Sequence, residues 1–202
     1  FDQIVDEIKA GHSYISDGKS HIIDFRVNDL ELGMKDSELR LDSPQTVRIQ
    51  ARVAAFLPIE QDEIGAFIAS RAHNQPPYWD LERARIGTTR RVPVELIVNG
   101  VAVAKQDIVA DGGWKSLTFE HSLQKSSWIA VRILTSAHTN PIFVLVNGRP
   151  IRSRESVEWC LKGVDQCWKM KEERIRDEER DAARAAYNHA RRVYTRMLDE
   201  LN

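Results

Sequence analysis

The sequence has few cysteines, no long apolar run and almost no net charge. Two cysteines in 202 residues are too few for a disulfide framework, or for a thiolate metal site without histidines nearby. No stretch approaches the roughly 20 apolar residues that span a bilayer. With 29 Lys and Arg against 30 Asp and Glu, no positive field attracts nucleic acid. The sequence therefore predicts neither a membrane span nor a nucleic-acid partner. It leaves the compartment open, export from a bacterium included.

Motifs typical of a complete enzyme are also missing. The six histidines form no HxH or HExxH pair, and no GxSxG or SxxK motif marks a nucleophile. The only clustered set is His12 and His21 with Asp17 and Asp24. A metal site needs three or more such groups that converge, so we interpret this set as a polar hairpin end. The sequence predicts no catalytic residue, no metal ligand and no cofactor on this chain.

Short apolar segments separated by turn residues are what the chain does contain. In residues 46–56 apolar side chains alternate with polar ones, which is typical of a strand with one wet face. Asn99-Gly100 joins two such segments, 92–98 and 101–109, and is a strong hairpin signal. Further strands are expected at 13–16, 22–27, 38–41, 79–86, 114–119, 127–134 and 142–146. The fold class is mainly β with C-terminal α: an antiparallel, immunoglobulin-like β-sandwich followed by a two-helix tail.

Three parts are expected along the chain. Residues 1–11 show helical spacing that stops at Gly11, and we interpret them as the end of a helix from a domain upstream. Residues 12–152 form the sandwich, interrupted at 57–77 by an irregular excursion with a short helix around 63–70. Residues 153–202 form the helical tail.

The second tail helix, 177–201, has an apolar stripe that needs a partner. The candidates are the preceding helix, the sandwich, the upstream region, or another subunit in a homo-oligomer.

Aromatic, arginine and cysteine side chains each leave two interpretations open. Tyr78, Trp79 and Trp114 either fill the core or form a platform on which a ligand stacks. Arg83 and Arg85 either lie on a solvated, salt-bridged face or bind an anion or a neighbouring domain.

Cys160 and Cys167 are either two buried thiols or a disulfide. On an unbroken helix they lie roughly 10.5 Å apart along the axis, whereas a disulfide needs Cα atoms within about 7 Å. A bridge therefore requires the helix to break, and Gly163 is where a break is expected.

Four blocks, taken in order, resemble the C-terminal region of one enzyme family. Residues 11–18, GHSYISDG, resemble the segment that follows the catalytic domain in CehA/McbA-type metallohydrolases of the PHP (polymerase and histidinol phosphatase) superfamily. Residues 138–144, HTNPIFV, resemble a strand near the end of the same proteins. Blocks 77–87 and 158–168 look like those of a bacterial branch. The resemblance covers nearly the whole chain but only the family's C-terminal part, and His12 replaces the usual Arg.

The resemblance implies a non-catalytic accessory domain of a metal-dependent hydrolase. The divalent metal and its ligands would lie in a PHP barrel that precedes Phe1, in the same polypeptide, and that barrel would be the main partner. The sandwich would pack on the barrel and shape substrate access with residues 57–77. Ser16, Asp17, His21 and His138 are then expected at the active-site mouth or the interdomain contact. The alternative is a free-standing module that binds carbohydrate or protein through Tyr78, Trp79 or Trp114.

Overall fold

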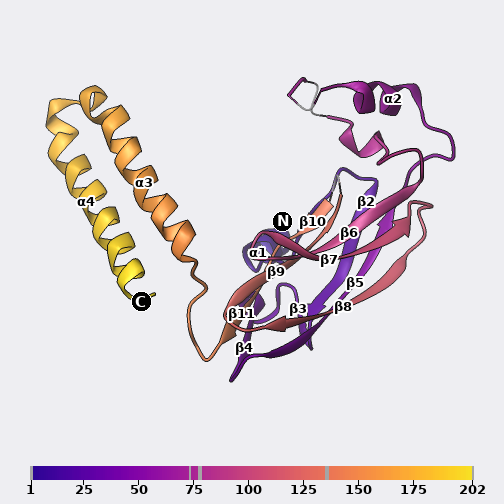
Figure 1. The fold of residues 1–202 in the computed structure, drawn as a ribbon, viewed down its shortest axis with the longest axis horizontal. Coiled ribbons are helices and arrows are strands. Elements are labelled where there is room, and N and C mark those ends of the chain that lie inside the picture. Colours follow the sequence, from indigo (N-terminus) through magenta and orange to yellow (C-terminus); the bar gives the residue numbers. More distant parts are fainter. Residues whose placement is uncertain (1, 73, 77–78, 135–136, 202) are drawn as a thin grey trace. The chain divides into compact units, whose positions relative to one another are not determined.

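The structure is a computed structural model that describes residues 2–72, 74–76, 79–134 and 137–201. It divides into two compact units, Phe1–Pro150 and Ile151–Asn202. The first unit consists of two β-sheets with short helices in their connections, and the second is a helical hairpin (Figure 1).

The larger sheet, called sheet A, is built around strand β9. β9 pairs with β6 on one edge and with β10 and β11 on the other. β7 extends the sheet beyond β6, β1 beyond β10, and β4 beyond β11. Every pair is antiparallel except β4 with β11, which is parallel. The strands are β1 (Tyr14–Ile15), β4 (Glu38–Leu41), β6 (Arg91–Val98), β7 (Val101–Val109), β9 (Ser127–Ile133), β10 (Ala137–Thr139) and β11 (Ile142–Val146).

The smaller sheet, called sheet B, has four antiparallel strands in the order β3-β2-β5-β8. They are β2 (Ser20–Val27), β3 (Leu30–Glu31), β5 (Gln45–Ala55) and β8 (Lys115–Leu123). The expected β-sandwich is therefore confirmed, with helices after it.

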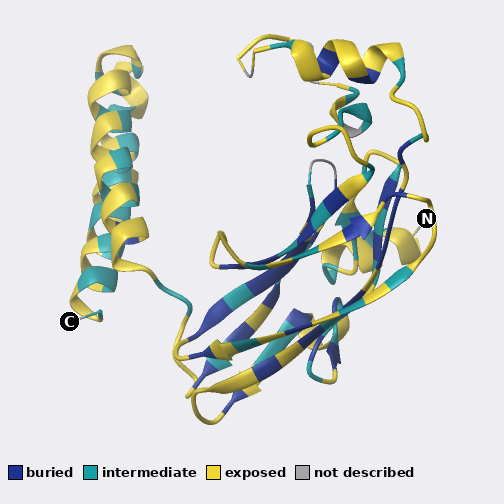
Figure 2. Cartoon of the chain, turned by 45° about the vertical axis from the view of Figure 1, so that its right-hand side comes forward, coloured by how far each residue is buried: buried dark blue, intermediate teal, exposed yellow. Residues whose placement is uncertain are grey.

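Alternation in β5 shows why the sandwich closes. Val47, Ile49 and Val53 are fully buried, whereas Arg48 and Arg52 between them are exposed. Strands of both sheets bury one face in the same way, and these faces meet in a single core (Figure 2). The main core residues are Ile22, Phe25, Val27, Val94, Leu96, Ile129, Val131, Ile133, Ile142 and Val144.

The Asn99-Gly100 turn is confirmed between β6 and β7. Asn99 has φ 50° and Gly100 φ 86°, and Val98 pairs with Val101 across them. Positive φ at both central residues is the type I′ geometry, whose twist matches that of the flanking strands.

The excursion after β5 contains the expected helix, α2 (Glu63–Ser70). Asp62 caps it by accepting a hydrogen bond from Gly65 N at 2.6 Å. The strand expected at 79–86 is wrong: the described part has a 3-10 turn, η2 (Leu81–Arg83). Its arginines bind the excursion itself, since Arg83 pairs with Asp62 at 2.8 Å and Arg85 donates to the Ile59 carbonyl at 3.1 Å.

Helix α1 (Asp2–Lys9) precedes β1. Another 3-10 turn, η1 (Met34–Ser37), joins β3 to β4. Neither η1 nor the short strands β3 and β10 was expected from the sequence.

In the second unit, α3 (Arg154–Lys171) and α4 (Asp177–Asp199) are joined by η3 (Glu172–Arg174). The helices run antiparallel: residues progressively nearer the start of α3 contact residues progressively nearer the end of α4. Glu172 meets Arg184 at 3.4 Å, the Trp168 ring lies 5.0 Å from the Tyr187 ring, and Asp165 meets Arg191 at 2.6 Å. The preceding helix is thus one partner of the apolar stripe. Half-buried residues line the facing sides of the helices (Figure 2).

The cysteine expectations need correction. Cys160 and Cys167 are both free, because α3 runs through Gly163 without a break. Neither cysteine is buried: both are half-buried, and Cys167 accepts a hydrogen bond from Tyr187 of α4. Along the described ranges, none of the helices has both the length and the apolar character needed to cross a membrane.

Candidate functional site

The two ends of the sandwich sequence meet at strands β1 and β10. Tyr14 pairs with Thr139, and Ile15 with His138. The Asn140 amide then donates to the Gly11 carbonyl at 3.1 Å. Blocks 11–18 and 138–144, far apart in the sequence, therefore form one structural unit.

Ser16 and Asp17 close the turn between β1 and β2. Asp17 Oδ1 accepts hydrogen bonds from the backbone N–H groups of Lys19 (2.8 Å) and Ser20 (3.2 Å). The Ser16 hydroxyl donates to the Ser20 carbonyl and accepts from Gly18 N at 2.9 Å. These contacts are those of an Asx turn, so both side chains hold the loop that carries the chain into β2.

His21 belongs to a surface cluster on sheet B. Its Nδ1 lies 2.9 Å from the Tyr14 hydroxyl, and its ring lies 6.5 Å from the Trp114 ring. The Arg52 guanidinium lies 5.4 Å from the Trp114 ring centroid and pairs with Asp24 at 3.1 Å. These five residues are called the Tyr14–Trp114 cluster below.

Trp114 and Trp79 do not fill the core. Trp114 is 46% exposed and Trp79 is 69% exposed, so the interpretation of both as core residues is wrong. Tyr78 lies outside the described residues. Arg52 lies over the Trp114 ring, which hinders stacking of a ligand on that side.

His138 is not part of the cluster around His21. It lies at an apolar groove on the outer face of sheet A. The groove has a volume of ≈ 460 Å³. Ile97 and Ala130 face away from the core, yet each is only 7% exposed, and they form the floor. Trp128 and Phe143 pair across β9 and β11 beside it. This surface is called the outer-face groove below.

Asn140, which lines this groove, also binds the Gly11 carbonyl just after the end of helix α1. The helix has no buried residue, and Ile4 and Ile8 are 64% and 61% exposed. An eight-residue helix is marginal in water without packing. The apolar side of α1 is therefore a surface in need of a partner.

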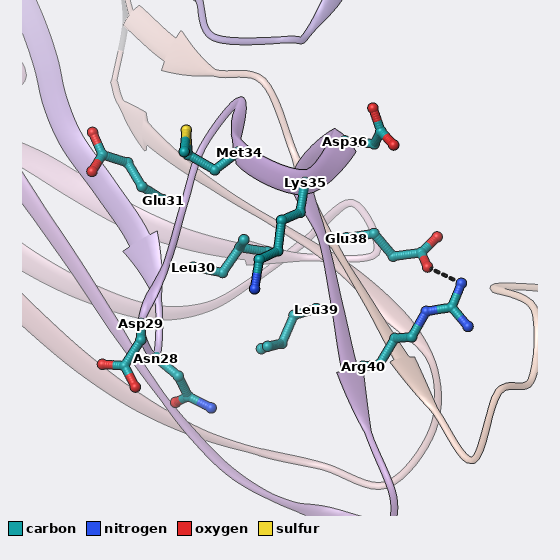
Figure 3. A pocket seen from close by; sticks show the side chains of 10 residues that line it. All are labelled: Asn28, Asp29, Leu30, Glu31, Met34, Lys35, Asp36, Glu38, Leu39 and Arg40. Carbon is teal, nitrogen blue, oxygen red and sulfur yellow. Dashed lines mark ion pairs between the residues drawn. The ribbon is translucent and has the colours of Figure 1, made fainter.

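A larger pocket lies between β3 and β4, the end strands of the two sheets (Figure 3). Its volume is ≈ 950 Å³, and carboxylates outnumber cations in its lining. Glu38 pairs with Arg40 at 2.6 Å, and Glu31 with Arg26 at 3.3 Å. The lining consists of Asn28, Asp29, Leu30, Glu31, Met34, Lys35, Asp36, Glu38, Leu39 and Arg40.

Sequence reasoning missed this pocket because its wall is a strained turn without periodicity. Lys35, Asp36 and Ser37 have φ of 50°, 55° and 54°, a left-handed run that is costly for residues other than glycine. Ser37 Oγ stabilises the turn by accepting from Gly33 N at 2.8 Å. Gly33, at φ 83°, begins this chain reversal.

Two carboxyl groups have lowered pKa values, and both lie in loops rather than in a catalytic arrangement. The Gly65 N–H and then Arg83 lower the pKa of Asp62. The Gly113 N–H and then Lys115 lower that of Asp111. Across the described part of the chain, no three His, Cys, Asp or Glu side chains gather as a metal site.

No protein-family model matches the chain, and no curated protein matches it. Among the solved structures, seven chains match. One is the CARDB domain of a protein from Pyrococcus furiosus, solved in complex with di-metal ions. It is 10% identical over 65% of this chain and 90% of that chain, with a TM-score of 0.35. A likeness this distant carries no argument about ligands, so the family expected from the sequence stays a prediction.

Proposed function

We propose that the chain is a non-catalytic accessory domain that packs on another domain of the same polypeptide. The observation that carries this proposal is the exposed apolar side of α1, where Ile4 and Ile8 are 64% and 61% exposed and no residue is buried. The outer-face groove exposes further apolar surface, with Phe143 at 40% exposure. Exposed apolar surface of this kind is typical of interaction sites.

The resemblance supplies the identity of the partner. A PHP-type catalytic barrel encoded upstream of Phe1 would bring the divalent metal and the hydrolytic chemistry. The pairing of blocks 11–18 and 138–144 supports this proposal, because two of the four matching blocks build one corner of the sandwich beside α1. Ser16 and Asp17 shape that corner, while His21 and His138 flank it. Residues 57–77 would then border substrate access.

The test compares two proteins: the chain alone and the longer product of its gene. Ile8→Asp is expected to change the free energy of unfolding of the chain alone by less than about 0.5 kcal/mol, since Ile8 is 61% exposed. Phe143→Asp should cost about 1–2 kcal/mol there, because part of the ring is buried on strand β11. In the longer protein each should cost about 1–3 kcal/mol more, because a charge would enter a buried contact. Val101→Asp, at 63% exposure on the hairpin tip, is the matched control and should be neutral in both.

Equal effects of Ile8→Asp in the two proteins would refute packing through this surface. An upstream coding region without an HxH motif would refute the hydrolase identity while leaving the packing test valid. Hydrolase activity of the longer protein, lost after metal chelation, would support it.

A second candidate is a carbohydrate-binding module that uses Trp114. The exposed indole beside His21, Asp24 and Arg52 favours it, because sugar ligands combine stacking with polar contacts. Binding of oligosaccharides that quenches tryptophan fluorescence in the chain, and is abolished by Trp114→Ala, would support this alternative over the accessory role. No quenching at millimolar ligand would exclude it.

A further inference from the structure

Helix α4 has a second face, turned away from α3. Glu178 and Arg196 each lie nine residues from Tyr187, which is two and a half turns at 3.6 residues per turn. Both therefore project opposite Tyr187, whose ring contacts Trp168 of α3. The exposed residues on this side, called the α4 back face below, include Glu178, Asp181, Ala182, Ala185, Arg192 and Arg196.

Charges on the two faces of α4 differ in their pairing. On the side of α3, Arg184 and Arg191 form ion pairs with Glu172 and Asp165. On the back face, Glu178, Asp181, Arg192 and Arg196 form no ion pair with any described residue. Within the described hairpin, the arginines of α4 on the side of α3 are therefore paired, whereas the four charged side chains on the back face are not.

Between Glu178 and Arg196 the free charges are sorted along the helix, acidic near its start and basic near its end, and the exposed Asp199 lies beyond this stretch in the last turn. The helix dipole favours that order and accounts for Glu178 in the first turn. Its effect fades within one turn, so it does not account for Asp181 or Arg192, which lie further in. A partner with the reverse order of charge does account for both.

We propose that this partner is the α4 back face of a second copy of the chain, packed antiparallel. The two-fold axis would cross the back face at the level of Tyr187 along the helix, because Glu178 and Arg196 lie at equal distances from Tyr187. Glu178 of one copy then lies opposite Arg196 of the other, and Asp181 lies beside Arg192. Symmetry doubles each pair. A parallel arrangement would set like charges against each other.

Small side chains occupy part of the proposed contact, and the exposed His189 lies near its centre. Ala182 and Ala185 are exposed between the acidic and the basic ends. Two hairpins joined in this way form a four-helix bundle, an architecture that buries helix faces a single hairpin leaves in water. Within the described second unit only Val157 of α3 is buried, and no residue of α4 is, so the hairpin has surface left to bury. This assembly does not depend on the proposed accessory function.

The experiment measures the mass of the full chain by sedimentation equilibrium, with charge reversals on the two sides of the proposed contact. The unmodified chain is expected to dimerise. Asp181→Arg and Arg192→Asp should each raise the dimer Kd by on the order of tenfold, since each creates two like-charge contacts. The double variant should restore the Kd to within about threefold, because the swapped charges attract again. Asp107→Arg on β7 is the matched control and should leave the Kd unchanged.

Far-UV circular dichroism of each variant distinguishes loss of the contact from loss of the helix. A chain that stays monomeric at about 100 μM, well above typical Kd values of stable dimers, would overturn the proposal. So would a dimer that is insensitive to both single reversals, since it would use another surface. Failure of the double variant to recover, with helix content unchanged, would overturn the antiparallel register.

Discussion

The Asn140 side-chain amide donates a hydrogen bond to Ser13 Oγ at 2.9 Å and another to the Gly11 carbonyl at 3.1 Å. Backbone pairing continues the contact, as Asn140 N donates to the Ser13 carbonyl at 3.3 Å. One asparagine thus fixes the direction in which α1 leaves the sandwich. That direction decides which surface the apolar side of α1 presents to a neighbour.

Asn140→Ala should destabilise the chain by about 1–3 kcal/mol, because two hydrogen-bond partners are left unsatisfied in a half-buried site. Amide hydrogen exchange of residues 11–15 should accelerate more than that of β5. Gln124→Ala, which removes one exposed bond to Ser122 Oγ, is the control and should change stability by under about 0.5 kcal/mol. Unchanged exchange at residues 11–15 would contradict the role of Asn140.

Gly33 and Gly18 form a matched pair for the packing of the strained turn. Both have positive φ, 83° and 89°. A Cβ at Gly33 would lie 2.3 Å from His12 Cβ, whereas a Cβ at Gly18 would meet nothing within 4 Å. Gly18→Ala should therefore cost about 1–2 kcal/mol for the backbone alone. Gly33→Ala should cost about 1–3 kcal/mol more for the clash. Urea unfolding measures the difference, and equal costs would show that His12 does not contact Gly33.

The lowered pKa of Asp62 predicts that the stability of the loop around α2 depends on pH. Its pKa lies below the ordinary value of 3.8, first because of the Gly65 N–H and then because of Arg83. The stabilisation that the ionised Asp62 carboxylate gives the folded chain is therefore present above pH 3.8. It is lost as the pH falls through the lower pKa that Asp62 has in the folded protein. The amide shift of Gly65 should follow this titration by NMR. Arg83→Gln should move the midpoint upward, though not fully, because the Gly65 bond remains. A midpoint at or above 3.8 in the unmodified chain would contradict the contact.

Cys167 is expected to react with iodoacetamide faster than Cys160 in the same molecule. A hydrogen bond from the Tyr187 hydroxyl to Cys167 Sγ, 3.4 Å long, and then Lys171 lower the pKa of this thiol. The thiolate is the reacting species. Tyr187→Phe should slow alkylation of Cys167 several-fold and leave Cys160 unchanged. Mass spectrometry of quenched time points measures both rates, and equal rates in the unmodified chain would refute the expectation.

Strands that bury one face could be predicted from the sequence, because their period-two pattern reports burial directly. The alternation from Val47 to Val53 and the Asn99-Gly100 turn were read correctly for this reason. The strand expected at 79–86 was wrong because alternation there had another cause. Arg83 and Arg85 bind Asp62 and the Ile59 carbonyl within the loop, so tertiary contacts replaced strand pairing.

The sites were harder to predict, since they depend on which strands become neighbours. His21 was singled out, but its contacts with Tyr14 and Trp114 join three separate strands or turns. The pocket between β3 and β4 could not be predicted from the sequence, because a two-residue strand and a left-handed turn produce no periodic pattern of apolar residues. The charged residues on the back face of α4 can be seen in the sequence. Which of them lack an ion pair can be told only from the structure of the hairpin.

The parallel pairing of β4 with β11 has a consequence for biosynthesis. Phe143 must emerge from the ribosome before Glu38 finds its strand partner, so the sandwich cannot close while its first half is being translated. Ile151–Asn202 follows the last strand. At typical rates of about 5–20 residues per second, its translation takes roughly 3–10 s. The nascent sandwich can therefore complete its pairing only after β11 has been translated, while the residues of the second unit are being added.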